Sequence, residues 1–348
     1  MASSTQGRGR WHPGRELLFW LVVLSGLAFF WPDLFRGLPD PFLSTGDYLD
    51  TLIMLTMLAV GSLLPRDELE QLARRWPMVI FGTFVQYTTM PLLAFGTALA
   101  AGLPPGSPLM IGVLIVGAVP GAMASNVLTL LARGHVSYSI SLTTLATLIS
   151  PLMVPTILWL ALSQWVAFPV LRTARDLTIL VVLPVVTGYL LSRYWTWWQS
   201  LARTVGPLVA NLAILWIIAV VVARNRGRLA DMNWVIPVVL IVINLGGYLA
   251  GYLAAVLFRL PVSMRRALCL EIGMQNAGLG TVLALQLFGQ GSLAAMPPAL
   301  YTFVCMFTGT ALARLWSRVP IREKLVDGKS QSPGLEEEVG ACHPVKVD

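Results

Sequence analysis

Residues 117–126 read GAVPGAMASN and residues 271–280 read EIGMQNAGLG, and each stretch interrupts a long apolar run. Pro120 has no amide hydrogen and clashes with the preceding helical turn, while Gly121 relaxes the backbone beside it. The second stretch combines glycines with Glu271, an acidic residue in an otherwise mostly apolar region. Both stretches predict an interrupted helix, and the second places a carboxylate at the interruption.

The composition predicts a polytopic membrane protein. Of the 348 residues, 56% are hydrophobic and only 12% are charged, whereas a soluble domain carries about 25% charged residues. The mean hydropathy is +0.72, and apolar runs extend from Leu17 to Trp316. We expect a multi-pass protein surrounded by lipid, in a plasma membrane such as the bacterial inner membrane.

Ten membrane spans can be read along the chain, each near the ~20 residues that cross a bilayer core. The predicted spans are residues 17–32, 48–64, 77–101, 108–132, 136–162, 177–193, 205–223, 234–258, 264–289 and 296–315. Five spans fall in residues 17–162 and five in residues 177–315. These halves form two inverted repeats, because a half with an odd number of spans enters the membrane the other way round.

The distribution of basic residues predicts that both termini are cytoplasmic. Of the 24 Lys and Arg, 18 fall on the side of the termini and six on the other side, and cytoplasmic loops carry such an excess. Arg224, Arg226 and Arg228 lie on the outer side and go against this rule. Residues 1–16 are interpreted as a cytoplasmic N-terminus before a retained first helix, rather than as part of a cleaved signal peptide. The polar residues 327–348 are interpreted as a disordered cytoplasmic tail.

The two interrupted spans, the fourth and the ninth, share a weak sequence echo. MASN ends at Asn126 and MQN ends at Asn276, 150 residues further on. Paired interruptions at matching positions point to the midplane binding site of a transporter. Freed carbonyls at such breaks can coordinate cations, and the N-terminal end of the following half-helix can face an anion. The alternative for the first break is a Pro-Gly kink that binds nothing.

Glu271 is the strongest candidate for a functional group, because ionisable residues inside a membrane are costly and face cavities or bundle interiors. The alternative is an interfacial ion pair with Arg265 or Arg266, which lie one or two helical turns away. That pair would leave unexplained the amides of Gln275 and Asn276, which lie deeper and also need partners.

Other polar side chains in apolar spans supply oxygen atoms. Ser139, Thr143 and Thr147 are four residues apart and share one face of the fifth span, while Gln86 is an isolated amide in the third. Each feature alone is typical of helix packing. Together with Glu271 they make an all-oxygen set suited to Na⁺ rather than to a transition metal. One or two such cations would also neutralise the buried carboxylate.

Several other classes of site are not predicted. The three cysteines are scattered and form neither a disulfide framework nor a metal-ligand spacing. No catalytic motif stands out, so the protein is not expected to be an enzyme. The net charge of +7 resides mainly in loops and tails, which argues against a nucleic-acid partner, and no obligate protein partner is evident.

Three stretches resemble the bile acid:sodium symporter family: FVQYTTMP at residues 84–91, GAVPGAMASNVLTLLARGHVSYSISLTTLATLISPLMVP at residues 117–155, and EIGMQNAGLG at residues 271–280. The resemblance covers most of spans three to five and nine, and its motifs SNV-x-T-x-L-A-x-G and E-x-G-M-Q-N are specific. It implies an all-α membrane protein of ten transmembrane helices in two inverted five-helix repeats. Spans 1, 2, 6 and 7 would form a panel, and spans 3–5 and 8–10 a core in which broken helices four and nine cross.

The resemblance also implies two sodium sites, whose ions would act as coupling ions. The first would use Ser125, Asn126, Ser139, Thr143 and Glu271. The second would use Gln86, Glu271 and Gln275 with the main-chain oxygens of Ile272 and Met274. Glu271 would belong to both sites and couple them.

The substrate that the resemblance implies is a small organic anion, with Asn276 facing its cavity. Two positions depart from the bile-acid-binding members of the family. Met123 stands where Thr often precedes Ala-Ser-Asn, and Cys305-Met306 stands where some members have His-Asn. These cavity changes leave the cargo open between a bile-acid-like molecule and a smaller monocarboxylate.

The predicted function is a secondary transporter that couples Na⁺ entry to uptake of this anion by alternating access. Two alternatives stay open. One is a transporter of the same fold driven by protons, with Glu271 as the proton carrier. The other is a membrane receptor or enzyme that does not transport.

Overall fold

The computed structural model describes residues 13–230, 234–289 and 291–319. Over these ranges the chain forms helices and loops, with a single isolated bridge in place of any strand. Most of the predicted cytoplasmic N-terminus and all of the predicted tail at 327–348 lie outside the described residues.

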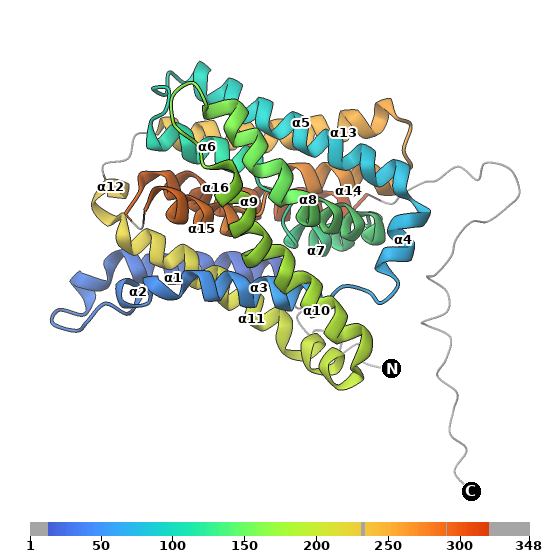
Figure 1. Ribbon diagram of the computed structural model, residues 1–348, viewed down its shortest axis with the longest axis horizontal. Helices are drawn as coiled ribbons and strands as arrows, with labels where there is room; N and C mark the ends of the chain where they lie inside the picture. Colours follow the sequence, from blue (N-terminus) through green and yellow to red (C-terminus); the bar gives the residue numbers. More distant parts are fainter. Residues whose placement is uncertain (1–12, 231–233, 290, 320–348) are drawn as a thin grey trace, which may run out of the picture.

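The helices follow one another along the chain (Figure 1). Their bounds are α1 Pro13–Leu34, α2 Pro41–Ser44, α3 Leu49–Ser62, α4 Glu68–Arg74, α5 Trp76–Ala100, α6 Pro108–Ala118, α7 Ala124–Leu131, α8 Val136–Leu162, α9 Val170–Leu177, α10 Leu183–Tyr194, α11 Thr196–Arg224, α12 Arg226–Ala230, α13 Val235–Leu257, α14 Val262–Gly273, α15 Ala277–Phe288 and α16 Met296–Ser317. Each of the ten predicted spans contains one long helix or a pair of shorter helices separated by an interruption.

Six helical stretches of the described residues are long and apolar enough to cross a membrane. They are Trp76–Ala100, Val136–Leu162, Val170–Tyr194, Thr196–Arg224, Val235–Leu257 and Leu293–Ser317. Shorter apolar helices cover Leu18–Leu34, Pro108–Ala118 and Ala277–Phe288. The described part of the chain is therefore all-helical, with the length and apolar composition of a multi-pass membrane protein.

The helix of the predicted sixth span begins earlier than the hydropathy indicates, at Val170. Its first turns carry Arg172, Arg175 and Asp176. These charged residues lower the hydropathy of the stretch, so a span predicted from apolar residues begins after them. The structure pairs both arginines with Asp176, at 3.7 and 3.1 Å. A π-helical stretch, Thr178–Val182, then joins α9 to α10.

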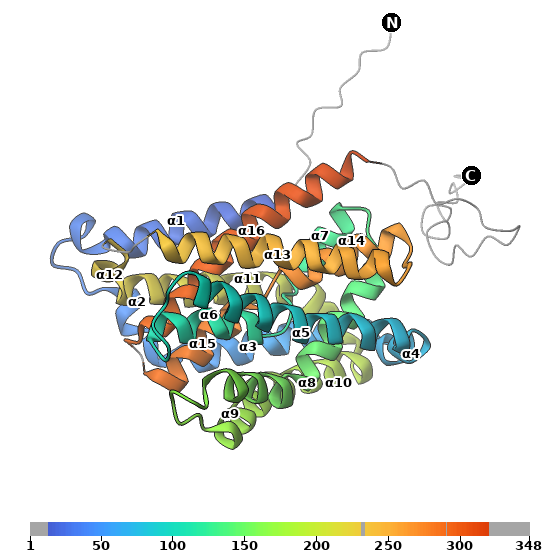
Figure 2. The same cartoon turned by 90° about the horizontal axis from the view of Figure 1, so that it is seen from above.

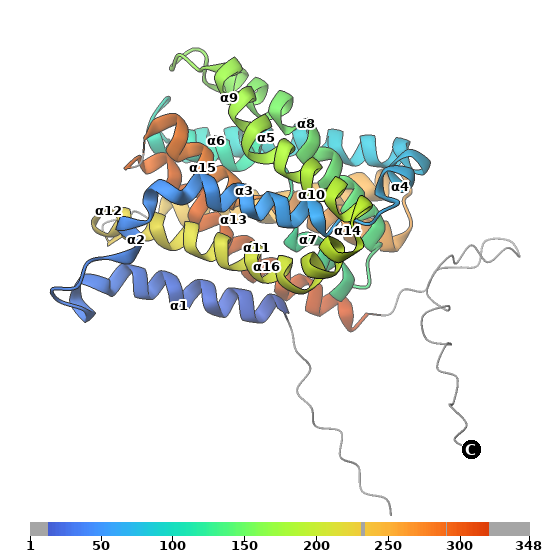
Figure 3. The same ribbon diagram turned by 60° about the horizontal axis from the view of Figure 1, so that its bottom comes forward.

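The helices pack in two groups. In the first group α3 packs on α10 and α11, and α11 packs on α1 (Figure 3). In the second group α5 packs on α6, α8 and α13, and α13 packs on α14 and α16. The sixth span joins the groups, because α9 lies against α8 while α10 lies against α3 (Figure 2).

Small residues bring two helices of the first group close together. A Cβ on Gly61 of α3 would lie 2.0 Å from the carbonyl oxygen of Val185, and one on Gly188 of α10 would lie 2.3 Å from that of Leu58. The two backbones therefore approach in a way that no larger side chain permits. Because lipid is as apolar as the helix surfaces, such close packing is a main source of helix association in membranes.

Candidate functional site

Two interrupted helices meet at the centre of the second group. The first interruption separates α6 from α7, and the second separates α14 from α15. The Ala122 amide donates to the Met274 carbonyl at 2.8 Å, and the Asn276 amide donates to the Pro120 carbonyl at 2.8 Å. Each interruption thus satisfies backbone groups that the other has freed, which makes non-helical backbone tolerable away from water.

The Glu271 carboxylate lies beside this crossing and is surrounded by hydroxyl groups. Ser125 Oγ donates to Oε2 at 2.5 Å, Ser139 Oγ donates to Oε2 at 3.4 Å, and Thr143 Oγ1 donates to Oε1 at 2.7 Å. Ser125 comes from α7, and the other two donors come from α8. Glu271 is 2% exposed, so three helices, α7, α8 and α14, enclose a carboxylate that water hardly reaches.

The interfacial ion pair considered from the sequence does not form. Arg265 donates to the Leu260 carbonyl at 2.6 Å. Arg266 donates to the carbonyls of Ala132 and Trp316, at 2.7 and 3.1 Å, and to that of Val319. Within the described ranges no Lys, Arg or His lies in ion-pair distance of Glu271. The carboxylate is therefore held by neutral donors alone.

Two of these helices, α7 and α8, supply further side-chain oxygen atoms to the same cluster. Thr143 Oγ1 lies 3.4 Å from Asn126 Oδ1. Thr129 Oγ1 donates to Ser139 Oγ at 3.3 Å. Ser125, Asn126, Ser139 and Thr143 are all buried. The five residues predicted as the first ion site are thus gathered in one place, with Thr129 beside them.

A second polar cluster joins α5 to the interruption after α14. Gln86 Nε2 donates to Gln275 Oε1 at 2.9 Å, and Gln275 Nε2 donates to the Ile272 carbonyl at 2.8 Å. Gln86 Oε1 is buried and accepts no hydrogen bond from the described residues. The carbonyl of Met274 is occupied by the Ala122 amide. The structure thus links three of the residues predicted for the second site, and it leaves one buried amide oxygen unpaired there.

The composition of the two clusters identifies the kind of ion that they suit. Their ligands are carboxylate, hydroxyl, amide and main-chain oxygens, which prefer hard cations. No group of three or more His, Cys, Asp or Glu able to hold a metal occurs in the part of the chain that the structure describes. The oxygen set fits an alkali cation better than a transition metal.

Comparison with known proteins identifies the family. Residues 51–232 match the Sodium Bile acid symporter family. Over 324 residues, which are 92% of this chain and 97% of the relative, the sequence is 33% identical to the uncharacterized sodium-dependent transporter YocS of Bacillus subtilis. The chain belongs to the sodium bile acid symporter family.

Two further relatives, from other organisms, are also named as sodium cotransporters. The probable sodium/metabolite cotransporter BASS1, chloroplastic, of Arabidopsis thaliana is 30% identical over 270 residues, 76% of this chain and 66% of the relative. Human sodium/bile acid cotransporter 4 is 28% identical over 265 residues, 73% of this chain and 60% of the relative. The family is thus one of sodium-dependent membrane transporters, in keeping with a chain that is not expected to be an enzyme.

The four residues predicted to contact the substrate divide into two pairs. Met123 and Asn276 lie at the two interruptions and are partly exposed, and Asn276 Oδ1 caps α15 by accepting from the Leu279 amide at 3.1 Å. Cys305 and Met306 are buried in α16, at 2% and 4% exposure. Only the first pair is therefore accessible in this conformation.

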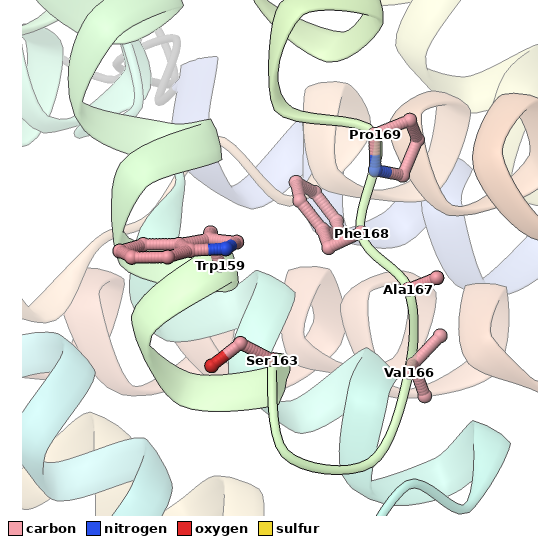
Figure 4. Close-up of a pocket in the computed structure, with 6 residues that line it drawn as sticks. All are labelled: Trp159, Ser163, Val166, Ala167, Phe168 and Pro169. Carbon is pink, nitrogen blue, oxygen red and sulfur yellow. The ribbon is translucent and has the colours of Figure 1, made fainter.

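A separate hollow of about 390 Å³ lies where α8 turns into α9 (Figure 4). The side chains of Trp159 and Phe168 point toward one another across it, and Ser163, Val166, Ala167 and Pro169 complete its lining. None of the predicted site residues lines this hollow. It is a feature of the α8–α9 connection rather than of the helix crossing.

Sequence reasoning missed four polar residues near the crossing: Thr129, Asn244, Tyr301 and Thr308. Asn244 and Tyr301 both contact the last carbonyl of α14. Asn244 carried a usable signal, because it is a lone amide in an apolar helix in the same way as Gln86. Thr129 also carried one, since it follows Ser125 by four residues and shares its helix face. Nothing in the sequence distinguished Tyr301 from an ordinary aromatic residue.

Proposed function

We propose that this protein couples the entry of Na⁺ to the uptake of a small organic anion by alternating access. The observation that carries the proposal is the Glu271 carboxylate, which is buried at a helix crossing, contacted by three hydroxyls and, among the described residues, paired with no cationic side chain. Membership in a family of sodium-dependent transporters supports it.

The energetics favour a cation at Glu271. Removing an ionised carboxylate from water costs several kcal/mol even after the protein relaxes. Each hydrogen bond to a charged group returns about 1.5–3 kcal/mol, so three hydroxyls offset part of that cost without removing the charge. A bound Na⁺ supplies the missing opposite charge, and the surrounding oxygens replace part of its hydration shell.

Two ion sites follow from the two clusters. In the first, Na⁺ binds the Glu271 carboxylate with Ser125, Asn126, Ser139 and Thr143. In the second, it binds Gln86, Gln275 and the main-chain oxygens of Ile272 and Met274, with Glu271 shared. Both amide side chains turn to present oxygen to this ion, and the unpaired Gln86 Oε1 is the atom that gains most from it.

The transport cycle uses the two helix groups. The first group, α1, α3, α10 and α11, acts as the panel, and the second acts as the core that carries the ions. Each group combines helices from both of the inverted five-helix repeats, and both termini lie in the cytoplasm. Ions bind first and order the interruptions, and the substrate then binds beside them. Movement of core against panel exposes the site alternately to the two sides.

The anion is bound near the N-terminal ends of α7 and α15, where helix dipoles favour negative charge. Met123 and Asn276 lie at these ends and contact the substrate first. Cys305 and Met306 contact it in a later conformation, once α16 has moved. Because Met123, Cys305 and Met306 offer no charge, the chemistry suits a bile-acid-like molecule or a smaller monocarboxylate.

The test uses the purified full-length protein in proteoliposomes. Entry of radioactive sodium, driven by an inward Na⁺ gradient, is measured with taurocholate or pantoate outside. Uptake of the anion is measured in the same vesicles with Na⁺ and again with K⁺ in its place. We expect one of these anions to accelerate sodium entry in the native protein and not in Glu271→Ala or Glu271→Gln. Anion uptake that follows a pH gradient and ignores the exchange of Na⁺ for K⁺ would replace this proposal with the proton-driven alternative. Anion binding without counterflow would identify a receptor.

A further inference from the structure

We propose that Asn244 and Tyr301 are positioning residues that set the geometry of the sodium site by fixing the last carbonyl of α14. This inference rests on the proposed function and adds to it two residues that contact no ion. Both side chains are 0% exposed, and they come from α13 and α16, helices that supply no predicted ion ligand.

The contacts converge on one atom. The Gly273 carbonyl oxygen accepts from Asn244 Nδ2 at 2.7 Å and from the Tyr301 hydroxyl at 2.8 Å. Gly273 is the final residue of α14, where a carbonyl has no intrahelical partner. One donor would satisfy it. Two donors from two helices use both of its lone pairs and fix its direction.

A third residue orients the asparagine. Thr308 Oγ1 donates to Asn244 Oδ1 at 2.7 Å, so the amide oxygen faces Thr308 and the amide nitrogen faces Gly273. The Tyr248 hydroxyl lies 3.2 Å from Thr308 Oγ1 and continues the network. A buried polar network in which each member is paired restrains its side chains more than isolated bonds do.

The position of Gly273 explains why the restraint matters for the ion. Gly273 lies between Ile272 and Met274, whose main-chain oxygens are assigned to the second sodium site. Peptide groups are planar, so the dihedral angles of Gly273 set how the Ile272 carbonyl is turned relative to the Gly273 carbonyl, and those of Met274 set how the Met274 carbonyl is turned relative to it. Fixing the Gly273 carbonyl toward α13 and α16 therefore restrains the peptide group that lies between the two carbonyls assigned to the ion.

Close packing at Gly273 adds to the restraint. A Cβ at this position would lie 2.1 Å from the ring of Tyr248. The end of α14 is thus pressed against α13 and cannot rotate toward it. An ion site needs its ligands held within a fraction of an ångström, and surrounding residues of this kind supply that precision.

The experiment measures the melting temperature of the purified protein during titration with NaCl, with choline chloride holding the ionic strength constant. Na⁺ that binds the folded state raises the melting temperature. Tyr301→Phe removes one donor and keeps the ring, and Thr308→Val releases the Asn244 amide. For each we expect the Na⁺ concentration at half-effect to rise about 3- to 10-fold, the worth of one net hydrogen bond. The melting temperature without Na⁺ measures separately what the lost hydrogen bond costs the fold.

Tyr189→Phe is the matched control. Its hydroxyl also donates to a main-chain carbonyl, that of Arg66 at 3.0 Å, but in the first helix group. It should leave the half-effect concentration unchanged. The inference is overturned if Tyr301→Phe and Thr308→Val bind Na⁺ as the native protein does. If the native protein shows no response to Na⁺ at all, the proposed function itself fails. Thr308→Val carries the test if Tyr301→Phe does not fold.

Discussion

Gly121 lies directly against the carboxylate of Glu271: a Cβ on residue 121 would be 2.2 Å from Oε1 and 2.8 Å from the carboxyl carbon. The glycine is required here by this close approach, because its backbone conformation is one that other residues also adopt. It allows the interruption of one broken helix to pass over the charged side chain of the other. The crossing and the acidic site are therefore a single arrangement.

The first prediction is that Gly121→Ala disrupts the site. The added methyl group must displace the carboxylate from Thr143 or separate the two interruptions. We therefore expect the apparent affinity for Na⁺ to fall at least about tenfold, as for loss of one hydrogen bond to a charged group. A Na⁺ titration of melting temperature measures it. Gly96→Ala on α5 is the control, since its Cβ would meet nothing within 4 Å. Native Na⁺ affinity in Gly121→Ala would contradict the described crossing.

The second prediction concerns the hydroxyls of α8. Thr143→Val keeps the side-chain shape but removes the donor to Glu271, and we expect Na⁺ affinity to fall about 10- to 100-fold, as for a hydrogen bond to a charged group. Thr156→Val on the same helix is the control, because its hydroxyl donates to the Leu152 carbonyl of its own helix. Equal effects of the two substitutions would show that α8 stability, and not ion binding, is what changed.

The third prediction separates the two ion sites. Gln86→Leu removes the amide of the second cluster and leaves every donor to Glu271 in place. We expect Na⁺ to stabilise this variant still, but with a Hill coefficient reduced to about one, because cooperativity cannot exceed the number of sites. Thr97→Val, whose hydroxyl bonds the Leu93 carbonyl of the same helix, is the control. A cooperative response that persists in Gln86→Leu would exclude the second site.

The fourth prediction concerns Glu68, a carboxylate in α4 outside the membrane-spanning helices. Ser141 Oγ donates to its Oε1 at 2.7 Å, while Oε2 is buried and accepts no hydrogen bond from the described residues. Burial raises the pKa of Glu68, and Asp67 raises it further, while the Ser141 bond and Arg75 lower it. The net direction is upward, so the folded protein holds this proton more tightly than the unfolded chain does.

Stability should therefore fall as pH rises from the ordinary glutamate pKa through the raised one, since the unfolded chain ionises first. Glu68→Gln removes this dependence and can still accept the Ser141 bond. We expect the variant to be at least as stable as the native protein at neutral pH and to lose that advantage below about pH 4.5. Melting temperatures across this range measure the difference. An advantage that grows as pH falls would show that the pKa of Glu68 is lowered instead.

Three arginines go against the predicted orientation of the chain. They are Arg224, Arg226 and Arg228. Arg226 pairs with Asp40 and also bonds the Ala28 carbonyl, and Arg228 donates to the Gly291 carbonyl at 2.6 Å. Arg226 thus joins α12 to α1 and to the start of α2, and Arg228 joins α12 to the loop before α16, roles that a count of basic residues does not detect.

The sequence by itself determined the class of the protein, the approximate spans and the two interruptions. These features are local: apolar length, a proline without an amide hydrogen and glycines beside it act within a few residues. It also singled out Glu271, because a charge in an apolar run is conspicuous without any knowledge of its neighbours. What it left open was the choice between a surface ion pair with Arg265 or Arg266 and a buried site.

Only the tertiary structure decided that choice. Ser125 is 146 residues from Glu271 in the chain, and Thr143 is 128 residues from it, so no local pattern could pair them. Gly273 likewise meets Asn244 and Tyr301 only because α13 and α16 pack on α14. Helix packing brings such distant residues within hydrogen-bond distance, and the physical reason is that a polar group away from water must find its partner within the protein.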